Sequence, residues 1–154
     1  MKFIVTIDGP SSSGKSTLAK RLAKRLSISH IDSGSIYRAV TLFAIENNLF
    51  VNQKLLIKKL LNGLSNSDIS LKENTYGIFK MYINGLDVED KIRGSKVSKY
   101  VSEIAKYEKI RNFVLKIQRD ISKNKSIVMD GRDIGSFVFP NADVKFYIDA
   151  SIKT

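Results

Sequence analysis

The sequence predicts an α/β fold, a doubly wound parallel sheet with a small antiparallel β insert, from three observations. Residues 3–7 are an unbroken apolar run rich in β-branched side chains, typical of a parallel strand buried on both faces. From Leu18 to Leu26 the apolar residues recur at the spacing of one helix face. The pair Asn84-Gly85 separates two short apolar runs, which is a strong signal for a tight hairpin.

Between that strand and that helix lies a glycine-rich stretch that fits the phosphate-binding pattern G-x-x-x-x-G-K-[ST]. It consists of Gly9, Pro10, Ser11, Ser12, Ser13, Gly14, Lys15 and Ser16. Backbone N–H groups and the positive end of the helix dipole meet there, which suits a polyphosphate. Lys15 is expected to reach the β- and γ-phosphates, Ser16 to hold Mg²⁺, and Thr17 to add a hydroxyl. The pattern predicts a P-loop nucleotide-binding fold, and ATP or GTP as the ligand.

The next elements follow the same alternation of strand and helix. Residues 28–31 predict a short strand, and Asp32, Ser33 and Gly34 a turn that caps a second helix ending at Asn47 and Asn48. A third helix is predicted through Leu55, Leu56, Leu60 and Leu61, stopping at Asn62 and Gly63. The only histidine, His30, is interpreted as a strand residue and is assigned no role.

The period then changes to that of short strands around residues 69–71 and 78–83, so the antiparallel insert is placed at about residues 64–95. Two helices follow, with apolar faces at residues 97–105 and 110–121. Residues 126–129 predict a buried strand that ends at Asp130-Gly131, and residues 144–148 predict another. The whole chain, residues 1–154, is interpreted as one domain with ligands at the carboxyl ends of its strands.

Composition narrows the function further. There are no cysteines, which excludes disulfides, thiolate metal sites and cysteine nucleophiles. The first apolar run is too short for a signal peptide or a membrane span, so the cytoplasm is the expected location and no membrane partner is expected. The net charge of +11 comes from 19 lysines and 7 arginines against 15 acidic residues. Because the lysines are spread along the chain, they are interpreted as a solvated surface and not as a nucleic-acid footprint.

Three segments taken together resemble the bacterial cytidylate (CMP) kinase family. They are the phosphate loop, the run Asp32-Ser33-Gly34-Ser35-Ile36-Tyr37-Arg38, and the run Asp130-Gly131-Arg132-Asp133-Ile134-Gly135. Support comes from Ile7-Asp8-Gly9-Pro10, from Val97-Ser98 with Ser102 and Arg111 downstream, and from Val138-Phe139-Pro140-Asn141-Ala142-Asp143. The resemblance covers essentially the whole chain, and the insert corresponds to the family's monophosphate-binding region.

The resemblance implies phosphoryl transfer from ATP to CMP or dCMP, a step of pyrimidine metabolism, and it implies roles for individual residues. Lys15, Arg38 and Arg132 are the expected catalytic residues, the two arginines on the acceptor phosphate, where a rigid fork meets two oxygens at once. Asp130 is expected to hold Mg²⁺ together with Ser16. The expected substrate-binding residues are Ser33, Tyr37, Arg38, Ser102, Arg111, Arg132 and Asp133, of which Ser102, Arg111 and Asp133 match the cytosine pocket.

The resemblance also implies segments beyond this chain. We expect an arginine-bearing lid, a further strand and a closing helix to be absent from it. Three explanations stay open: a shortened form of a longer protein, an inactive remnant, or a second chain that supplies the rest. Two functions stay open as well. One is a monomeric nucleoside monophosphate kinase, and the other is a catalytically incomplete nucleotide-binding fragment with an RNA-facing role.

Overall fold

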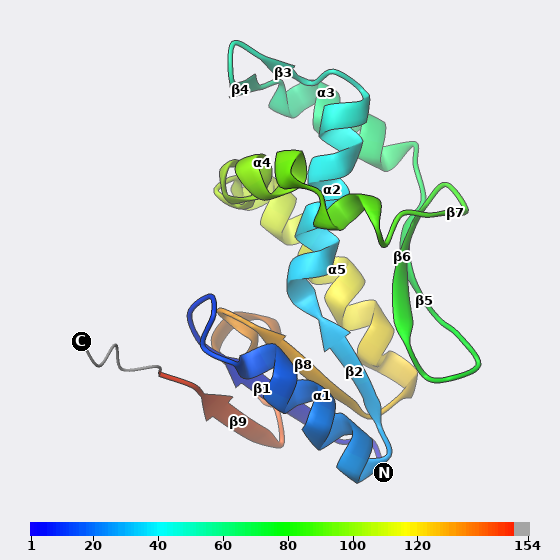
Figure 1. Ribbon diagram of the computed structural model, residues 1–154, viewed down its shortest axis with the longest axis vertical. Helices are drawn as coiled ribbons and strands as arrows, with labels where there is room; N and C mark the ends of the chain where they lie inside the picture. Colours follow the sequence, from blue (N-terminus) through cyan, green and yellow to red (C-terminus); the bar gives the residue numbers. More distant parts are fainter. Residues whose placement is uncertain (150–154) are drawn as a thin grey trace. The chain divides into compact units, whose positions relative to one another are not determined.

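The computed structural model describes residues 1–149, which form two compact units (Figure 1). The first unit combines residues 1–33 with the described chain from residue 118 onward, and the second comprises residues 34–117. The helices α2 (Ser33–Glu46) and α5 (Glu108–Ile121) each contain a boundary between the units. None of the helices within the described residues is long and apolar enough to cross a bilayer.

A four-stranded parallel sheet forms the centre of the first unit. In order across the sheet its strands are β2 (Ser29–Asp32), β8 (Ile127–Gly131), β1 (Ile4–Asp8) and β9 (Val144–Tyr147). All three neighbouring pairs are parallel. The central strands β1 and β8 are almost entirely buried, as their apolar sequences require. The predicted α/β fold with a parallel sheet is therefore confirmed.

Helix α1 (Lys15–Leu26) packs on one face of this sheet (Figure 1). It begins after Gly14, whose φ of 84° lies in the left-handed region that glycine adopts at little cost. Its buried residues Ala19 and Ala23 join a core cluster with Val5 and Ile7 of β1. Burial of this apolar face holds the start of α1 at the carboxyl end of β1.

The chain between β8 and β9 passes through a short π-helix, Ile134–Val138, which the sequence did not predict. A 3₁₀ turn, Ser122–Asn124, links α5 to β8. Arg119 of α5 donates to the carbonyl oxygens of Val138 at 3.1 Å and Phe137 at 3.3 Å. The guanidinium therefore satisfies two carbonyl groups at the C-terminal end of the π-helix.

The second unit combines helices with two small antiparallel sheets. Besides most of α2 and α5, its helices are α3 (Ile57–Ser65) and α4 (Ser95–Ala105), the latter preceded by the 3₁₀ turn Lys91–Arg93. One sheet pairs β3 (Phe50–Val51) with β4 (Lys54–Leu55), and the other orders β5 (Ile69–Glu73), β6 (Phe79–Ile83) and β7 (Leu86–Asp87). A single apolar core, with Leu60, Met81 and Ile104 fully buried, joins these elements.

The hairpin predicted at Asn84-Gly85 is present. It connects β6 to β7, and its two residues have φ values of 49° and 80°. A two-residue turn with positive φ at both positions matches the twist of the strands it joins. The three strands β5–β7 all fall within the predicted insert of residues 64–95.

Both predicted ends of the third helix were wrong. Leu55 belongs to strand β4, which follows a tight turn where Asn52 and Gln53 have φ values of 48° and 64°. At the other end, α3 continues through Gly63 to Ser65. A Cβ at Gly63 would lie 2.8 Å from a ring carbon of Phe43, so this glycine serves close packing and does not end the helix.

Candidate active site

The loop between β1 and α1 has the backbone of an anion-binding site. Ser12 and Gly14 have positive φ values of 61° and 84°. No side chain caps the N-terminus of α1, and its first turn contains no acidic residue. The first N–H groups of the helix have no partner within the helix, and they carry the positive end of its dipole. This end of α1 therefore favours an anion.

The side chains of the loop also fit a phosphate ligand. The hydroxyl of Ser13 is buried, and no group of the described residues forms a hydrogen bond with it. A Cβ at Gly9 would meet the carbonyl oxygen of Ile148, so only glycine lets the loop pass this point. A buried hydroxyl without a protein partner is costly unless a ligand or water satisfies it, and phosphate oxygens are suitable acceptors.

Lys15 lies close to the loop that it follows. Its Nζ donates to the carbonyl oxygen of Pro10 at 3.1 Å. The ammonium group is thus held near the loop without an acidic partner at that contact, and it can exchange the carbonyl for a phosphate oxygen.

The structure brings the two predicted metal ligands into direct contact. The hydroxyl of Ser16 donates to Oδ2 of Asp130 at 2.6 Å, and Asp130 is only 1% exposed. Hydroxyl and carboxylate oxygens are the ligands that Mg²⁺ prefers, and this ion is usually bound by one or two carboxylates together with substrate phosphates. Within residues 1–149, no group of three or more acidic, histidine or cysteine side chains is placed to hold a metal ion.

His30 is a site residue that sequence reasoning missed. It lies on β2, as predicted, but its Nε2 is 2.5 Å from Oδ1 of Asp130. An ionised carboxylate has no proton to give, so the imidazole is the donor. Asp130 therefore uses one oxygen for Ser16 and the other for His30. The contact depends on the parallel pairing of β2 with β8, which no local pattern reveals.

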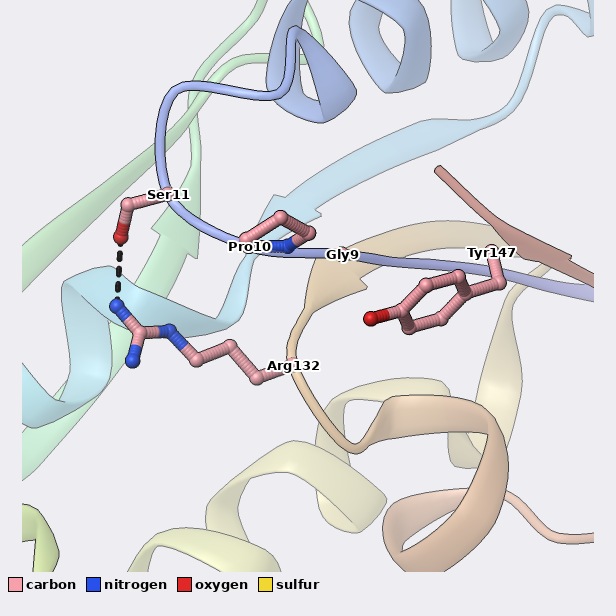
Figure 2. A pocket seen from close by; sticks show the side chains of 5 residues that line it. All are labelled: Gly9, Pro10, Ser11, Arg132 and Tyr147. Atoms are coloured by element: carbon pink, nitrogen blue, oxygen red, sulfur yellow. Dashed lines mark hydrogen bonds between the residues drawn. The ribbon is translucent and has the colours of Figure 1, made fainter. Parts of the chain in front are cut away.

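Arg132 completes the site of the first unit. Its Nη2 donates to the hydroxyl of Ser11 at 2.6 Å. Figure 2 shows this bond at one side of a pocket of about 450 Å³, with the ring of Tyr147 at the other side and Gly9 and Pro10 between them. The arginine and the phosphate loop thus share one pocket, which places a guanidinium beside the predicted phosphate position.

The predicted substrate residues divide between the two units. Asp133 and Arg132 belong to the first unit, as does Ser33, which is 4% exposed and whose hydroxyl lies against Gly131. The remaining predicted residues, Tyr37, Arg38, Ser102 and Arg111, belong to the second unit. That all of them form one acceptor site stays a prediction.

Within the second unit, both predicted arginines are held by hydrogen bonds. Arg38 donates to the hydroxyl of Ser98 at 3.0 Å and to the carbonyl oxygen of Ile92 at 3.2 Å. Arg111 donates through Nη1 to the carbonyl oxygen of Lys106 at 3.0 Å, at the C-terminal end of α4. A guanidinium has five N–H donors, so each arginine keeps donors for a ligand.

Comparison with known proteins points to one family. The family model described as cytidylate kinase matches residues 5–154. The chain is 45% identical to the cytidylate kinase of Flavobacterium psychrophilum, over 99% of this chain and 68% of the relative. It is 41% identical to that of Caldicellulosiruptor saccharolyticus, over 99% and 66%, and 44% identical to that of Parabacteroides distasonis, over 97% and 66%. The chain thus spans about two thirds of the length of these relatives.

Proposed function

The chain belongs to the cytidylate kinase family, and on that premise we propose that it transfers the γ-phosphoryl group of ATP to CMP or dCMP, giving ADP and CDP or dCDP. The observation that carries the proposal is the arrangement around the phosphate loop. Ser16, in the first turn of the helix that follows the loop, donates a hydrogen bond to Asp130. Arg132 donates a hydrogen bond to Ser11 within the loop. The phosphates of the donor and of the acceptor need positive charge at this site, and a divalent ion needs hard oxygen ligands.

The dominant obstacle in this reaction is the repulsion between two polyanions, so the proposed role of the protein is electrostatic clamping and alignment. Lys15 binds the β- and γ-phosphates, while Arg132 and Arg38 bind the acceptor phosphate. Mg²⁺, when bound at Ser16 and Asp130, supplies charge neutralisation to the donor phosphates. The attacking oxygen belongs to a phosphate that is already ionised at neutral pH, so the reaction requires no general base.

Specificity for cytosine is proposed to come from Asp133, Arg111 and Ser102. Cytosine presents an amino group beside an unprotonated ring nitrogen, whereas uracil presents a carbonyl beside an N–H. A carboxylate accepts from the amino group, and a guanidinium donates to the ring nitrogen and carbonyl. With uracil, each mismatched group would cost about 1–3 kcal/mol. Small nucleotides are then the only partners the reaction needs, and one copy of the chain in the cytoplasm is the simplest active form.

A coupled assay of ADP release with ATP, Mg²⁺ and CMP tests the proposal. We expect release that depends on CMP and that disappears in Lys15→Met, because methionine keeps an unbranched side chain but removes the charged ammonium group. Isothermal titration with ATP serves as the control for folding and binding. ADP release that is independent of CMP, or binding of nucleotide with no CMP-stimulated release, would favour the nucleotide-binding fragment instead. Salt-sensitive binding of RNA would strengthen that second reading.

A further inference from the structure

Asp8, the last residue of β1, holds the start of the π-helix. Its carboxylate accepts the backbone N–H of Ile134 at Oδ1 and that of Gly135 at Oδ2, each at 2.8 Å. Asp8 is 7% exposed. Hydrogen bonds to an ionised acceptor are about twice as strong as neutral ones, and a pair of them fixes orientation as well as distance. Asp8 is therefore an anchor, with both oxygens already occupied by the backbone.

Packing leaves the anchored turn little freedom to shift. A Cβ at Gly135 would lie 2.7 Å from the hydroxyl oxygen of Thr6 and 3.3 Å from Oδ2 of Asp8. The backbone of Gly135 therefore lies directly against β1, closer than any side chain would allow. At its other end the π-helix is held by the hydrogen bonds of Arg119.

The residue whose backbone these contacts hold in place is Arg132, two positions before Ile134. On its other side, the carbonyl oxygen of Gly131 accepts the N–H of Gly9 at 3.2 Å. The backbone on both sides of Arg132 is thus bound to Asp8 and Gly9, the last strand residue and the first loop residue. The guanidinium of Arg132 then binds Ser11, two residues further along the same loop.

We propose that Asp8 is a positioning residue that fixes Arg132 relative to the phosphate loop, so that the guanidinium meets the acceptor phosphate. The inference rests on the proposed function, since that function supplies the phosphate. This role requires no contact between Asp8 and the ligand, since each of its oxygens accepts a backbone N–H, from Ile134 and from Gly135. It acts through the geometry of Arg132.

The test is Asp8→Asn, with Asp143→Asn as the matched control. Asp143 also accepts a backbone N–H, from Ile4 at 2.7 Å, at the opposite end of β1. Asparagine keeps the shape of aspartate but turns an NH₂ toward one of the two N–H donors.

Dissociation constants for CMP and for MgATP are measured by isothermal titration, and KM and kcat by the coupled assay. We expect Asp8→Asn to weaken CMP binding about tenfold, which corresponds to roughly 1.4 kcal/mol. MgATP binding changes less than about threefold, and Asp143→Asn leaves both constants within about twofold.

A double substitution separates positioning from a general structural effect. If Asp8 acts through Arg132, Asp8→Asn in an Arg132→Ala background changes CMP affinity by less than about twofold. Arg119→Gln, which loosens the other end of the π-helix, is expected to give a smaller loss that also vanishes in that background. It takes the place of Asp8→Asn if that variant does not fold.

The possible results separate the positioning role of Asp8 from the kinase proposal on which it rests. Unchanged CMP affinity in Asp8→Asn, or an equal loss with and without Arg132, overturns the positioning role while the kinase proposal stands. Failure of the unsubstituted chain to bind CMP overturns the proposed function, and the inference with it.

Discussion

Replacing His30 with leucine tests the contact that ties β2 to the candidate metal carboxylate. Asp130 is 1% exposed, and its Oδ1 accepts from His30 at 2.5 Å. Leucine fills similar space but removes the donor, which leaves a buried carboxylate oxygen without its partner. That loss costs about 1–3 kcal/mol. Taking about 2 kcal/mol, and about 2–4 °C per kcal/mol for a chain of this size, Tm should fall by about 4–8 °C.

The assay is a double-mutant cycle on the free energy of unfolding, measured by urea denaturation in EDTA so that no metal ion contributes. It compares the unsubstituted chain with His30→Leu, Asp130→Asn and the double variant. A direct hydrogen bond between the two side chains predicts that the single losses are not additive, with a coupling energy of about 1–2 kcal/mol. His30→Asn, which retains an amide donor, should recover part of the loss.

Two results would refute this reasoning. One is His30→Leu matching the unsubstituted chain within about 0.5 kcal/mol, which is the range of ordinary surface substitutions. The other is strict additivity with Asp130→Asn, which would mean that the histidine stabilises the fold by packing alone.

His30→Leu should also affect metal binding, because His30 orients the carboxylate that faces Ser16. Mg²⁺ should raise the affinity for ATP by a factor that is about tenfold or more smaller in His30→Leu than in the unsubstituted chain.

Three further predictions concern catalysis, recognition and packing. Arg132→Lys should raise KM for CMP about tenfold in the coupled assay, because an ammonium group lacks the rigid fork with which a guanidinium meets two oxygens of one phosphate; an unchanged KM would contradict a role at the acceptor phosphate. In competition, CMP should be phosphorylated in clear preference to UMP, and equal rates would refute the proposed base contacts. Gly63→Ala should lower the free energy of unfolding by about 1 kcal/mol or more, although alanine favours helices, because its Cβ would overlap Phe43; a more stable variant would show that the ring moves aside.

Local patterns predicted much of this fold. The phosphate loop, the two strands that lead to residues 8 and 130, and the hairpin at Asn84-Gly85 were all found because neighbouring residues determine them. A glycine-rich turn between an apolar run and a helix-periodic run needs no information from elsewhere in the chain. The sequence also predicted that Ser16 and Asp130 hold one Mg²⁺ ion; the structure places their side chains in contact, and the shared ion stays a prediction.

The features that escaped prediction depend on partners distant in sequence or on turn geometry. The β3–β4 hairpin uses Asn52 and Gln53 at positive φ, and Gln53 is not a residue that signals such a turn. Gly63 resembles a helix stop until Phe43 is found beside it. The roles of His30 and Asp8 follow from the strand order β2-β8-β1-β9. In this order β8 lies beside two strands that are about a hundred residues away along the chain.

That strand order also explains how two buried aspartates can have different roles. Asp8 is the last residue of β1 and is 7% exposed, whereas Asp130 is the last but one residue of the neighbouring strand β8 and is 1% exposed. Asp8 binds two backbone N–H groups at the start of the π-helix, so a metal ion that took their place on its oxygens would disrupt this turn. Asp130 binds the side chains of Ser16 and His30. A hydroxyl can rotate toward a metal ion and become a ligand itself. Asp130 is therefore the aspartate suited to Mg²⁺, and Asp8→Asn should leave the Mg²⁺ dependence of ATP binding intact where Asp130→Asn removes it.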